Sequence, residues 1–248
     1  MYPVAVKLRV LTWNLNGLED RRRDERAEAA VLRILMHGEP PEILMFQEVV
    51  PRIFAAHLLP HLTHAGYAAV PAVPVSDSSY FCAIFVRAPL KPVEAFRIPL
   101  QSSRMGRAIV GLTAASEAGT VLISTAHLES GVGEGEVRRR QLRTAFRLLE
   151  DHDGPAIFGG DINARDRDVP VARVSDLWEK AGGPGKHRWT WSRGRSRHRF
   201  DRLYVNLRDE WSVDRFALDG HQGIFEDPSV PISDHLSVRV WLDWTAPR

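Results

Sequence analysis

Residues 157–166 read Ile157-Phe158-Gly159-Gly160-Asp161-Ile162-Asn163-Ala164-Arg165-Asp166. The apolar run closes on two glycines and a carboxylate, which predicts a buried strand that ends where the backbone crowds a ligand. Asp161 and Asn163 are two positions apart, so on an extended strand end we expect both on one side. A carboxylate beside a carboxamide can accept a proton from water and orient that water, and the planar fork of Arg165 suits phosphate. Glycine, Asp and Asn also make ordinary turns, so this motif alone leaves both interpretations open.

Polar side chains also stand where other apolar segments end. Apolar patterns predict strands over 6–15, 43–46 and 120–125, followed by or ending in Asn14, Glu48 and His127. Another strand is expected over 236–244, just after Asp234 and His235. The remaining expected elements are helices 24–37, 52–63 and 135–150 and strands 80–86, 107–113, 202–207 and 212–217. Because strands of a packed sheet place their ends along one edge, these polar residues are expected to gather into one site.

Composition favours a single globular domain over residues 1–248. The chain has 248 residues, of which 44% are hydrophobic, enough for a sizeable core. No apolar run approaches the ~18 residues of a membrane span, and the N-terminus lacks a signal-peptide pattern, so we expect no membrane partner. The single cysteine, Cys82, cannot form an internal disulfide. This fits a reducing compartment, and we expect a cytoplasmic protein.

The distribution of charge is more informative than the net charge of +2. Seven Lys or Arg residues lie between Lys186 and Arg202, against one acid. Trp189, Trp191 and Phe200 are interleaved with them. Basic residues among aromatics suit a phosphate backbone with stacked bases, although a solvated loop would have a similar composition.

Eight polar residues form the candidate site: Asn14, Glu48, His127, Asp161, Asn163, Asp201, Asp234 and His235. Six of them offer hard oxygen ligands and none is a cysteine, which favours Mg²⁺ or Mn²⁺ over zinc. Each also has a structural alternative. Asn14 could cap a turn, and Glu48 could be a surface acid before a loop. His127 could be a semi-buried histidine with satisfied hydrogen bonds, and Asp234 could cap a helical turn. Their common order at strand ends favours a functional site.

The motifs have a definite order along the chain: TWNLNG (12–17), QEV (47–49), HLES (127–130), GDIN (160–163), FDR (200–202) and SDH (233–235). In this order they resemble the endonuclease/exonuclease/phosphatase superfamily, across nearly the whole chain. HLES followed by GDINARDR most resembles the tyrosyl-DNA phosphodiesterase branch. The resemblance implies an α/β (α+β) fold, a four-layered αββα sandwich of two packed mixed sheets flanked by helices. It also implies a divalent-metal phosphodiesterase site.

The resemblance further implies roles for the metal-binding and water-activating residues. Glu48 would hold the catalytic Mg²⁺, for which Mn²⁺ could substitute, with Asn14 close by. Asp234 would act at the metal, directly or through water. Asp161 would activate the attacking water, and Asn163 would orient it.

The other carried-over roles concern the phosphate and the DNA strand. His127 and His235 would stabilise charge on the phosphoryl oxygens, and Asp201 would hold the tautomer of His235. The expected DNA-binding residues are Ser130 and Arg165 for the 5′ phosphate and Tyr80, Trp191 and Phe200 for the single-strand groove. The chain departs from the family after HLES, where Gly131-Val132 replace a basic residue. The phosphate contact that this residue would make is therefore either missing or supplied from elsewhere, with Arg138 as the candidate.

The implied reaction is hydrolysis of the phosphodiester between a tyrosine and a DNA 5′ end, leaving a 5′-phosphate. The expected partner is therefore DNA with a 5′-linked tyrosine or peptide on a single-stranded 5′ end, acted on by a monomer. An abasic-site endonuclease, a non-specific nuclease or a small phosphodiesterase of the same fold is the first alternative. A catalytically silent DNA-binding module is the second, but it predicts loss of a metal or base residue, and all are present.

Overall fold

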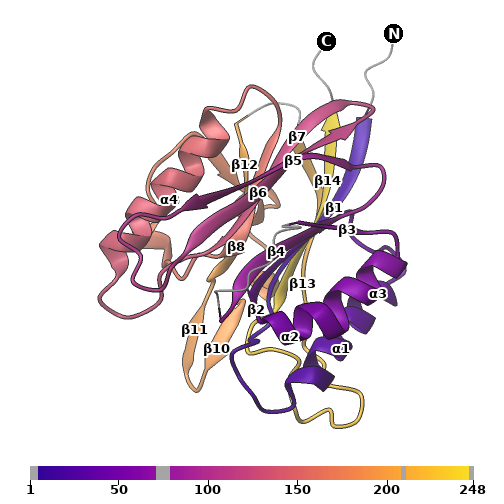
Figure 1. Ribbon diagram of the computed structural model, residues 1–248. Helices are drawn as coiled ribbons and strands as arrows, with labels where there is room; N and C mark the ends of the chain where they lie inside the picture. The colour runs from indigo at the N-terminus through magenta and orange to yellow at the C-terminus, as the bar shows by residue number, and fades with distance from the viewer. Residues whose placement is uncertain (1–4, 71–78, 208–210, 246–248) are drawn as a thin grey trace.

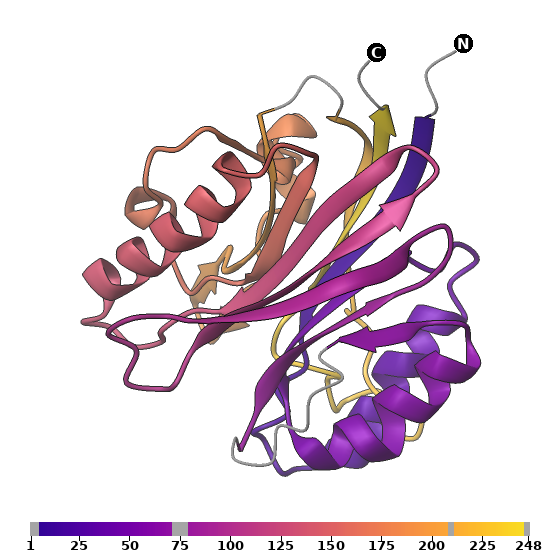
Figure 2. The same cartoon turned by 45° about the horizontal axis from the view of Figure 1, so that its top comes forward.

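A computed structural model describes residues 5–70, 79–207 and 211–245. Two six-stranded mixed sheets pack face to face, and helices cover both outer faces (Figures 1 and 2). The predicted four-layered αββα sandwich is therefore confirmed. Both chain termini lie at one end of the molecule, and a small two-stranded hairpin projects at the opposite end (Figure 1). Within the described residues, no helix is long and apolar enough to cross a membrane.

The first sheet is built around the parallel pair formed by the first two strands. Its order is β13 (Trp211–Asp219), β14 (Ser237–Thr245), β1 (Ala5–Asn14), β2 (Ile43–Val49), β4 (Phe81–Val86) and β3 (Ala68–Val70). All other neighbours in it are antiparallel. Helix α1 (Arg23–Leu35) makes the crossover between β1 and β2, so the carboxyl ends of both strands face the same edge.

The second sheet repeats this plan. Its order is β5 (Lys91–Pro99), β6 (Ala108–Ser116), β7 (Gly119–His127), β8 (Ala156–Asp161), β12 (Asp201–Asn206) and β9 (Val174–Asp176). Strands β7 and β8 are parallel and are joined by α4 (Gly135–Glu150), whose bounds match the expected helix. A separate hairpin consists of β10 (Trp191–Arg193) and β11 (Ser196–His198).

The expected helix over 52–63 is interrupted. It consists of α2 (Pro51–Ile53), the π-helical turn η1 (Phe54–Leu58) and α3 (Leu59–His64). Pro60 has no backbone N–H to donate, and the chain widens just before it, so that the Leu59 N–H bonds to the carbonyl of Phe54. The short elements are α5 (Leu177–Lys180) and the 3₁₀ turns η2 (Asp166–Asp168) and η3 (Gly185–His187).

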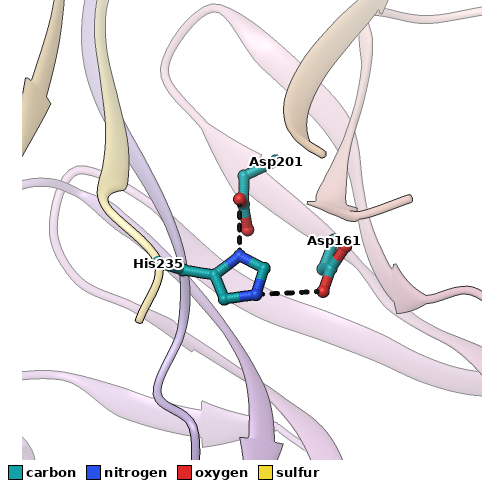
Figure 3. A group of neighbouring side chains, drawn as sticks. All are labelled: Asp161, Asp201 and His235. Atoms are coloured by element: carbon teal, nitrogen blue, oxygen red, sulfur yellow. Dashed lines mark hydrogen bonds and ion pairs between the residues drawn. The ribbon is translucent and has the colours of Figure 1, made fainter. Parts of the chain in front are cut away.

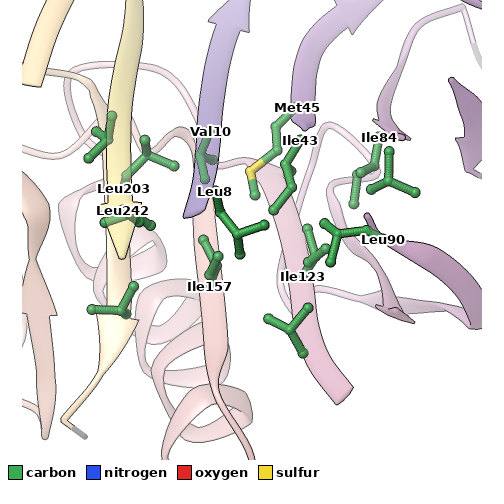
Figure 4. Packing of buried hydrophobic residues seen from close by; sticks show 14 of the residues in the cluster. Leu8, Val10, Ile43, Met45, Ile84, Leu90, Ile123, Ile157, Leu203 and Leu242 are labelled. Carbon is green, nitrogen blue, oxygen red and sulfur yellow. The ribbon is translucent and has the colours of Figure 1, made fainter. Parts of the chain in front are cut away.

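Three apolar layers hold the elements together. The central layer lies between the sheets and combines Val10 and Met45 of the first sheet with Ile157 and Leu203 of the second (Figure 4). Side chains of β1 that point the other way pack under α1 and α3, and α4 packs on the outer face of the second sheet. Because successive side chains of a strand point to opposite faces of the sheet, each strand contributes to the central layer and to one outer layer. The rigid double layer fixes the strand ends at which the polar residues stand.

Candidate active site

Asp161 stands at the centre of the cluster because its strand is flanked on both sides by functional residues. In the second sheet it is the register partner of His127 on parallel β7 and of Asp201 on antiparallel β12. Side chains of directly paired residues lie on the same face of a sheet. Residues far apart in the sequence are thus neighbours at the end of β8, and all three are buried.

The first sheet supplies the other half of the site. The side-chain amide of Asn14, at the end of β1, donates to Asp161 Oδ2 at 3.0 Å. Glu48, near the end of β2, lies 3.8 Å through Oε1 from His127 Nδ1. The predicted gathering of Asn14, Glu48, His127 and Asp161 from two sheets is therefore present in the structure.

His235 lies between two carboxylates (Figure 3). Its Nδ1 is 2.7 Å from Asp201 Oδ2, and its Nε2 is 3.7 Å from Asp161 Oδ2. Burial alone would lower the pKa of His235, but the charges of Asp201 and Asp161 outweigh it and raise the pKa to about 10. The expected contact between Asp201 and His235 is present, and it fixes the orientation of the ring with Nε2 toward Asp161.

His127 has the opposite electrostatic environment. Its Nε2 is 3.3 Å from Asp161 Oδ2, and its buried Nδ1 has no hydrogen-bond partner among the described residues. Burial lowers the pKa of His127 to about 3, although the charge of Asp161 opposes this shift. Two imidazoles therefore reach one carboxylate oxygen, one with a raised pKa and the other with a lowered pKa.

Glu48 occupies a strained bulge in β2. The pairing of β2 with β4 shifts register between Phe46 and Val49, and Glu48 adopts a positive φ of 52°. Gly17 allows the chain to pass here, since a Cβ at that position would approach the Glu48 carbonyl oxygen to 2.1 Å. Burial, followed by the charge of Asp161, raises the pKa of the Glu48 carboxyl. Such strain is typical of functional positions.

Two interpretations of residues 157–166 are wrong in detail. The glycines do not make room for a ligand: a Cβ on Gly160 would meet the Ala126 carbonyl oxygen at 2.0 Å, so the crowding comes from neighbouring β7. Asn163 is not on an extended strand end, because β8 ends at Asp161 and Asn163 adopts a φ of 49°. It approaches Asp161 through a turn instead, with its N–H donating to Asp161 Oδ1 at 3.0 Å.

The polar residues above form the floor of the site: Asn14, Glu48, His127, Asp161, Asp201 and His235. More exposed residues on loops and on the hairpin surround it, and we call them the rim: Tyr80, Ser130, Arg165, Trp191, Phe200 and Asp234. Trp191 stacks on His198, with ring centroids 5.8 Å apart, and lies against Phe200 at 5.6 Å. Its indole N–H donates to Asp234 Oδ2 at 3.0 Å. Two of the three residues expected at the single-strand groove, Trp191 and Phe200, therefore pack together, and Trp191 is joined to the SDH motif.

The other rim residues do not join the stack around Trp191. Tyr80 is not part of the Trp191–Phe200 stack, because its ring contacts that of His127, with centroids 6.4 Å apart. The half-buried Ser130 has its hydroxyl 3.3 Å from the sulfur of Met105. The side chain of Arg165 is exposed.

Arg138 is not placed to supply the missing phosphate contact. Its side chain is buried, and Nη1 donates to the backbone carbonyls of Glu129 and Gly131. The guanidinium therefore stabilises the loop after HLES rather than facing a substrate. Burial also lowers the pKa of Arg138.

Arg107 is a residue that sequence reasoning missed. It is 7% exposed, and its Nε and Nη1 have no hydrogen-bond partner among the described residues. The guanidinium lies 5.0 Å from the ring centroid of Tyr80, on the His127 side of the floor. A buried cation with unused donors beside a cluster of acids is suited to an anionic ligand. One arginine in a polar segment has no sequence signature that could have revealed this.

The donor set of the floor fits a hard divalent cation. Asp161, Asp201 and His235 bring one ligand atom each within 4.8 Å of one another, but His235 Nδ1 and Asp201 Oδ2 are already paired with each other. Glu48 adds a second carboxylate, and Asn14 adds an amide oxygen that also accepts from the Asn16 N–H. Asp161 faces His235, whereas Glu48 has no lysine or arginine partner within the described ranges, so the charge of Glu48 is left for a metal ion to balance.

Comparison with known proteins places this geometry in a family. Residues 11–235 match the profile of the Endonuclease/Exonuclease/phosphatase family, and the chain belongs to that family. The chain is similar to tyrosyl-DNA phosphodiesterase 2 of Gallus gallus, with 27% identity over 214 residues, 79% of this chain and 55% of the relative. It is also 29% identical over 250 residues to the 5′-tyrosyl-DNA phosphodiesterase of Caenorhabditis elegans, covering 92% of this chain and 65% of that protein.

Solved structures agree with these similarities. A humanized Danio rerio TDP2 superposes with a TM-score of 0.85 at 25% identity, covering 95% of this chain and 98% of that one. The Danio rerio TDP2 complexed with a single strand DNA product gives a TM-score of 0.84 at the same identity and coverage. The chain spans a little over half the length of the vertebrate relatives it matches.

Proposed function

We propose that this chain is a Mg²⁺-dependent phosphodiesterase that hydrolyses the bond between a tyrosine and the 5′ phosphate of DNA, as a monomer. The observation that carries the proposal is the convergence on Asp161 Oδ2 of the Asn14 amide and the imidazoles of His127 and His235. Relatives named for this reaction match over most of the chain, and a structural neighbour holds a single strand DNA product. The floor supplies most of the residues that the reaction needs, and Asn163 and the rim residue Asp234 are the others.

The arrangement suggests a division of labour around phosphorus. Asp161 accepts a proton from a water molecule as the water oxygen attacks phosphorus, and Asn14 and Asn163 hold the carboxylate in place. His235, oriented by Asp201, and His127 donate N–H groups to the non-bridging phosphoryl oxygens. The bond from phosphorus to the phenol oxygen breaks, and the tyrosine leaves as a phenolate that takes a proton from solvent.

Glu48 and Asn14 would hold the Mg²⁺, with Asp234 acting at the metal. When bound, the metal ion supplies positive charge that neutralises the phosphate. Glu48 fits this part because its carboxylate is mostly buried and has no arginine or lysine partner within the described residues. Arg107 places a second, permanent positive charge on the side of Tyr80.

The direct test is a panel of single-stranded oligonucleotides with a 5′-tyrosyl, a 3′-tyrosyl or an internal abasic group, assayed with Mg²⁺. We expect release of tyrosine and a 5′-phosphate from the first substrate only. Cleavage of the abasic oligonucleotide, with the 5′-tyrosyl substrate untouched, would overturn the proposed substrate. Wild type and Asp161→Asn are compared so that a contaminating nuclease is recognised.

A further inference from the structure

The hairpin over residues 191–198 carries three arginines without partners. Arg193, Arg195 and Arg197 are exposed, and within the part of the chain that the structure describes none of them forms an ion pair, hydrogen bond or ring contact. Nearby arginines differ: Arg199 and Arg202 both pair with Asp166. The positive charges of the hairpin arginines are therefore available to a binding partner outside the chain.

The pairing register separates these arginines onto different faces. Trp191 pairs with His198, Arg193 with Ser196, and Ser192 with Arg197. Directly paired side chains share a face and successive ones alternate, so Arg193 lies on the same face as Trp191 and His198. Arg197 lies on the opposite face, and Arg195 is in the turn beside Gly194, whose φ is 58°.

The base of the hairpin is tied to the active site. Trp191 forms a β-bridge with His235, and its indole N–H bonds to Asp234. From Trp191 to Arg193 the strand rises about 7 Å, roughly two base steps at the 3.4 Å spacing of a stacked strand. A nucleic-acid strand with a base on Trp191 would carry its next phosphates past Arg193. In Figure 1 the hairpin of β10 and β11 projects away from the two sheets.

We infer that the Arg193 face of the hairpin is a second phosphate-binding subsite, which holds the backbone of the single strand about two nucleotides beyond the scissile end. The inference rests on the proposed function, since it extends the same DNA-binding path. Arg195, at the turn of the hairpin, adds positive charge near this subsite. Arg197, on the other face, takes no direct part.

The test measures binding separately from turnover. The probe is a fluorescent, 5′-phosphorylated single strand of about 15 nucleotides with phosphorothioate linkages, titrated in Mg²⁺ over a range of salt concentrations. We expect Arg193→Gln to weaken binding several-fold. The slope of log K against log salt should become shallower by about 0.7, the value for one lost phosphate contact on a single strand.

Arg197→Gln is the matched control, because it removes the same charge from the same hairpin on the other face. Arg143→Gln, on the exposed side of α4, is a second control. Both should leave affinity and slope close to wild type. Equal losses of affinity in Arg193→Gln and Arg197→Gln would overturn the inference, because they would show that the hairpin acts only through its total positive charge. Unchanged affinity in both variants would also overturn it.

The outcome is independent of the proposed reaction. A 5′-phosphate strand is bound whether or not the enzyme releases tyrosine, so an inactive panel of tyrosyl substrates leaves this experiment interpretable. A p-nitrophenyl ester of a 5′-mononucleotide, which cannot reach Arg193, should be turned over equally by wild type and Arg193→Gln. A large rate loss on that short ester would show that Arg193 acts on the floor and would contradict a remote subsite.

Discussion

The floor and the rim of the site are built on different principles. Floor residues such as Asp161 and His127 are buried at the ends of central strands, where register fixes their neighbours. Rim residues such as Ser130 and Trp191 are more exposed and come from a loop and a hairpin. Strand ends hold reacting groups accurately, whereas loops can vary without disturbing them. We therefore expect changes in the floor to lower kcat and changes in the rim to raise KM for long substrates.

Metal removal should lower turnover the most, because it removes the positive charge proposed to neutralise the phosphate. A site based on one main carboxylate, Glu48, binds Mg²⁺ weakly, so excess chelator should leave no detectable turnover. The melting temperature should change little, since the three apolar layers that hold the fold together include no floor residue. Activity and thermal unfolding are measured in the same samples. Full turnover in chelator would remove the metal from the reaction.

Asp161→Asn should come next. The amide keeps the shape of the side chain but cannot accept the water proton, so kcat should fall by about 10²–10⁴-fold. The loss should be similar for an aryl and an alkyl phosphodiester, because the attacking water is the same for both. Steady-state kinetics on a p-nitrophenyl and a methyl ester of a 5′-nucleotide check this. A variant within about threefold of wild type would exclude Asp161 as the base.

His127→Ala should slow the reaction by about 10²-fold on both esters if the ring stabilises the phosphoryl oxygens. A phenol with a pKa near ~10 needs little help from an acid, whereas an alkoxide leaving group does. The quantity to compare is the ratio of aryl to alkyl rates in wild type and variant. A ratio near that of wild type supports the electrostatic role. A hundred-fold rise would make His127 the general acid instead.

Trp191→Ala should affect the rim alone. Loss of one stacked base costs roughly 1–3 kcal/mol, so kcat/KM on a 5′-tyrosyl oligonucleotide should fall about tenfold or more. Turnover of the mononucleotide aryl ester should be spared. Trp191→Phe keeps an aromatic face but loses the bond to Asp234, and it should recover most of the loss. Equal damage to both substrates in Trp191→Ala would instead make Trp191 a structural residue.

The smallest effect on activity should come from Asp219, whose side chain pairs with Arg33 at 2.8 Å and contacts no floor or rim residue among those described, although its backbone pairs with Ser237. Burial opposes ionisation, but bonds to Arg33 and the Gly220 N–H hold the pKa of Asp219 below its usual value. A carboxyl group whose pKa is lower in the folded state than in the unfolded state stabilises the fold at pH values above its unfolded pKa. This contribution is lost as the pH falls through the folded pKa. Asp219→Asn should therefore cost about 1 kcal/mol at pH 7, and the difference from wild type should shrink as pH falls below ~4 toward the lowered folded pKa. Denaturant unfolding across pH measures this, with kcat unchanged.

Strands and helices with strong apolar patterns were predictable from the sequence. Helix α4 matches its expected bounds because its buried positions repeat at helical spacing. Edge strand β5 (Lys91–Pro99) was missed, since nearly all its residues are exposed and no apolar alternation marks it. Strand β3 and the hairpin strands are only three residues long, too short for a period to appear.

The floor was predictable because its members follow apolar strands, whose ends a sheet must bring together. Arg107 was not, because its burial depends on the packing of Tyr80 against it. Arg138, the candidate for the missing phosphate contact, could not be judged for a related reason. The donors of a basic residue near the site can be occupied by backbone carbonyls, which a sequence does not show. The faces of the hairpin also needed the register, which one sequence does not contain.

The central claim is that water, activated on the floor by Asp161, attacks the 5′ phosphorus directly. A single turnover of a 5′-tyrosyl oligonucleotide in ¹⁸O-labelled water tests it, with mass spectrometry of the DNA, the tyrosine and the protein. We predict one labelled oxygen in the 5′-phosphate, unlabelled tyrosine and no phosphorylated protein at any time during the turnover. An unlabelled phosphate with labelled tyrosine, or a phosphorylated side chain that forms before product, would contradict the account.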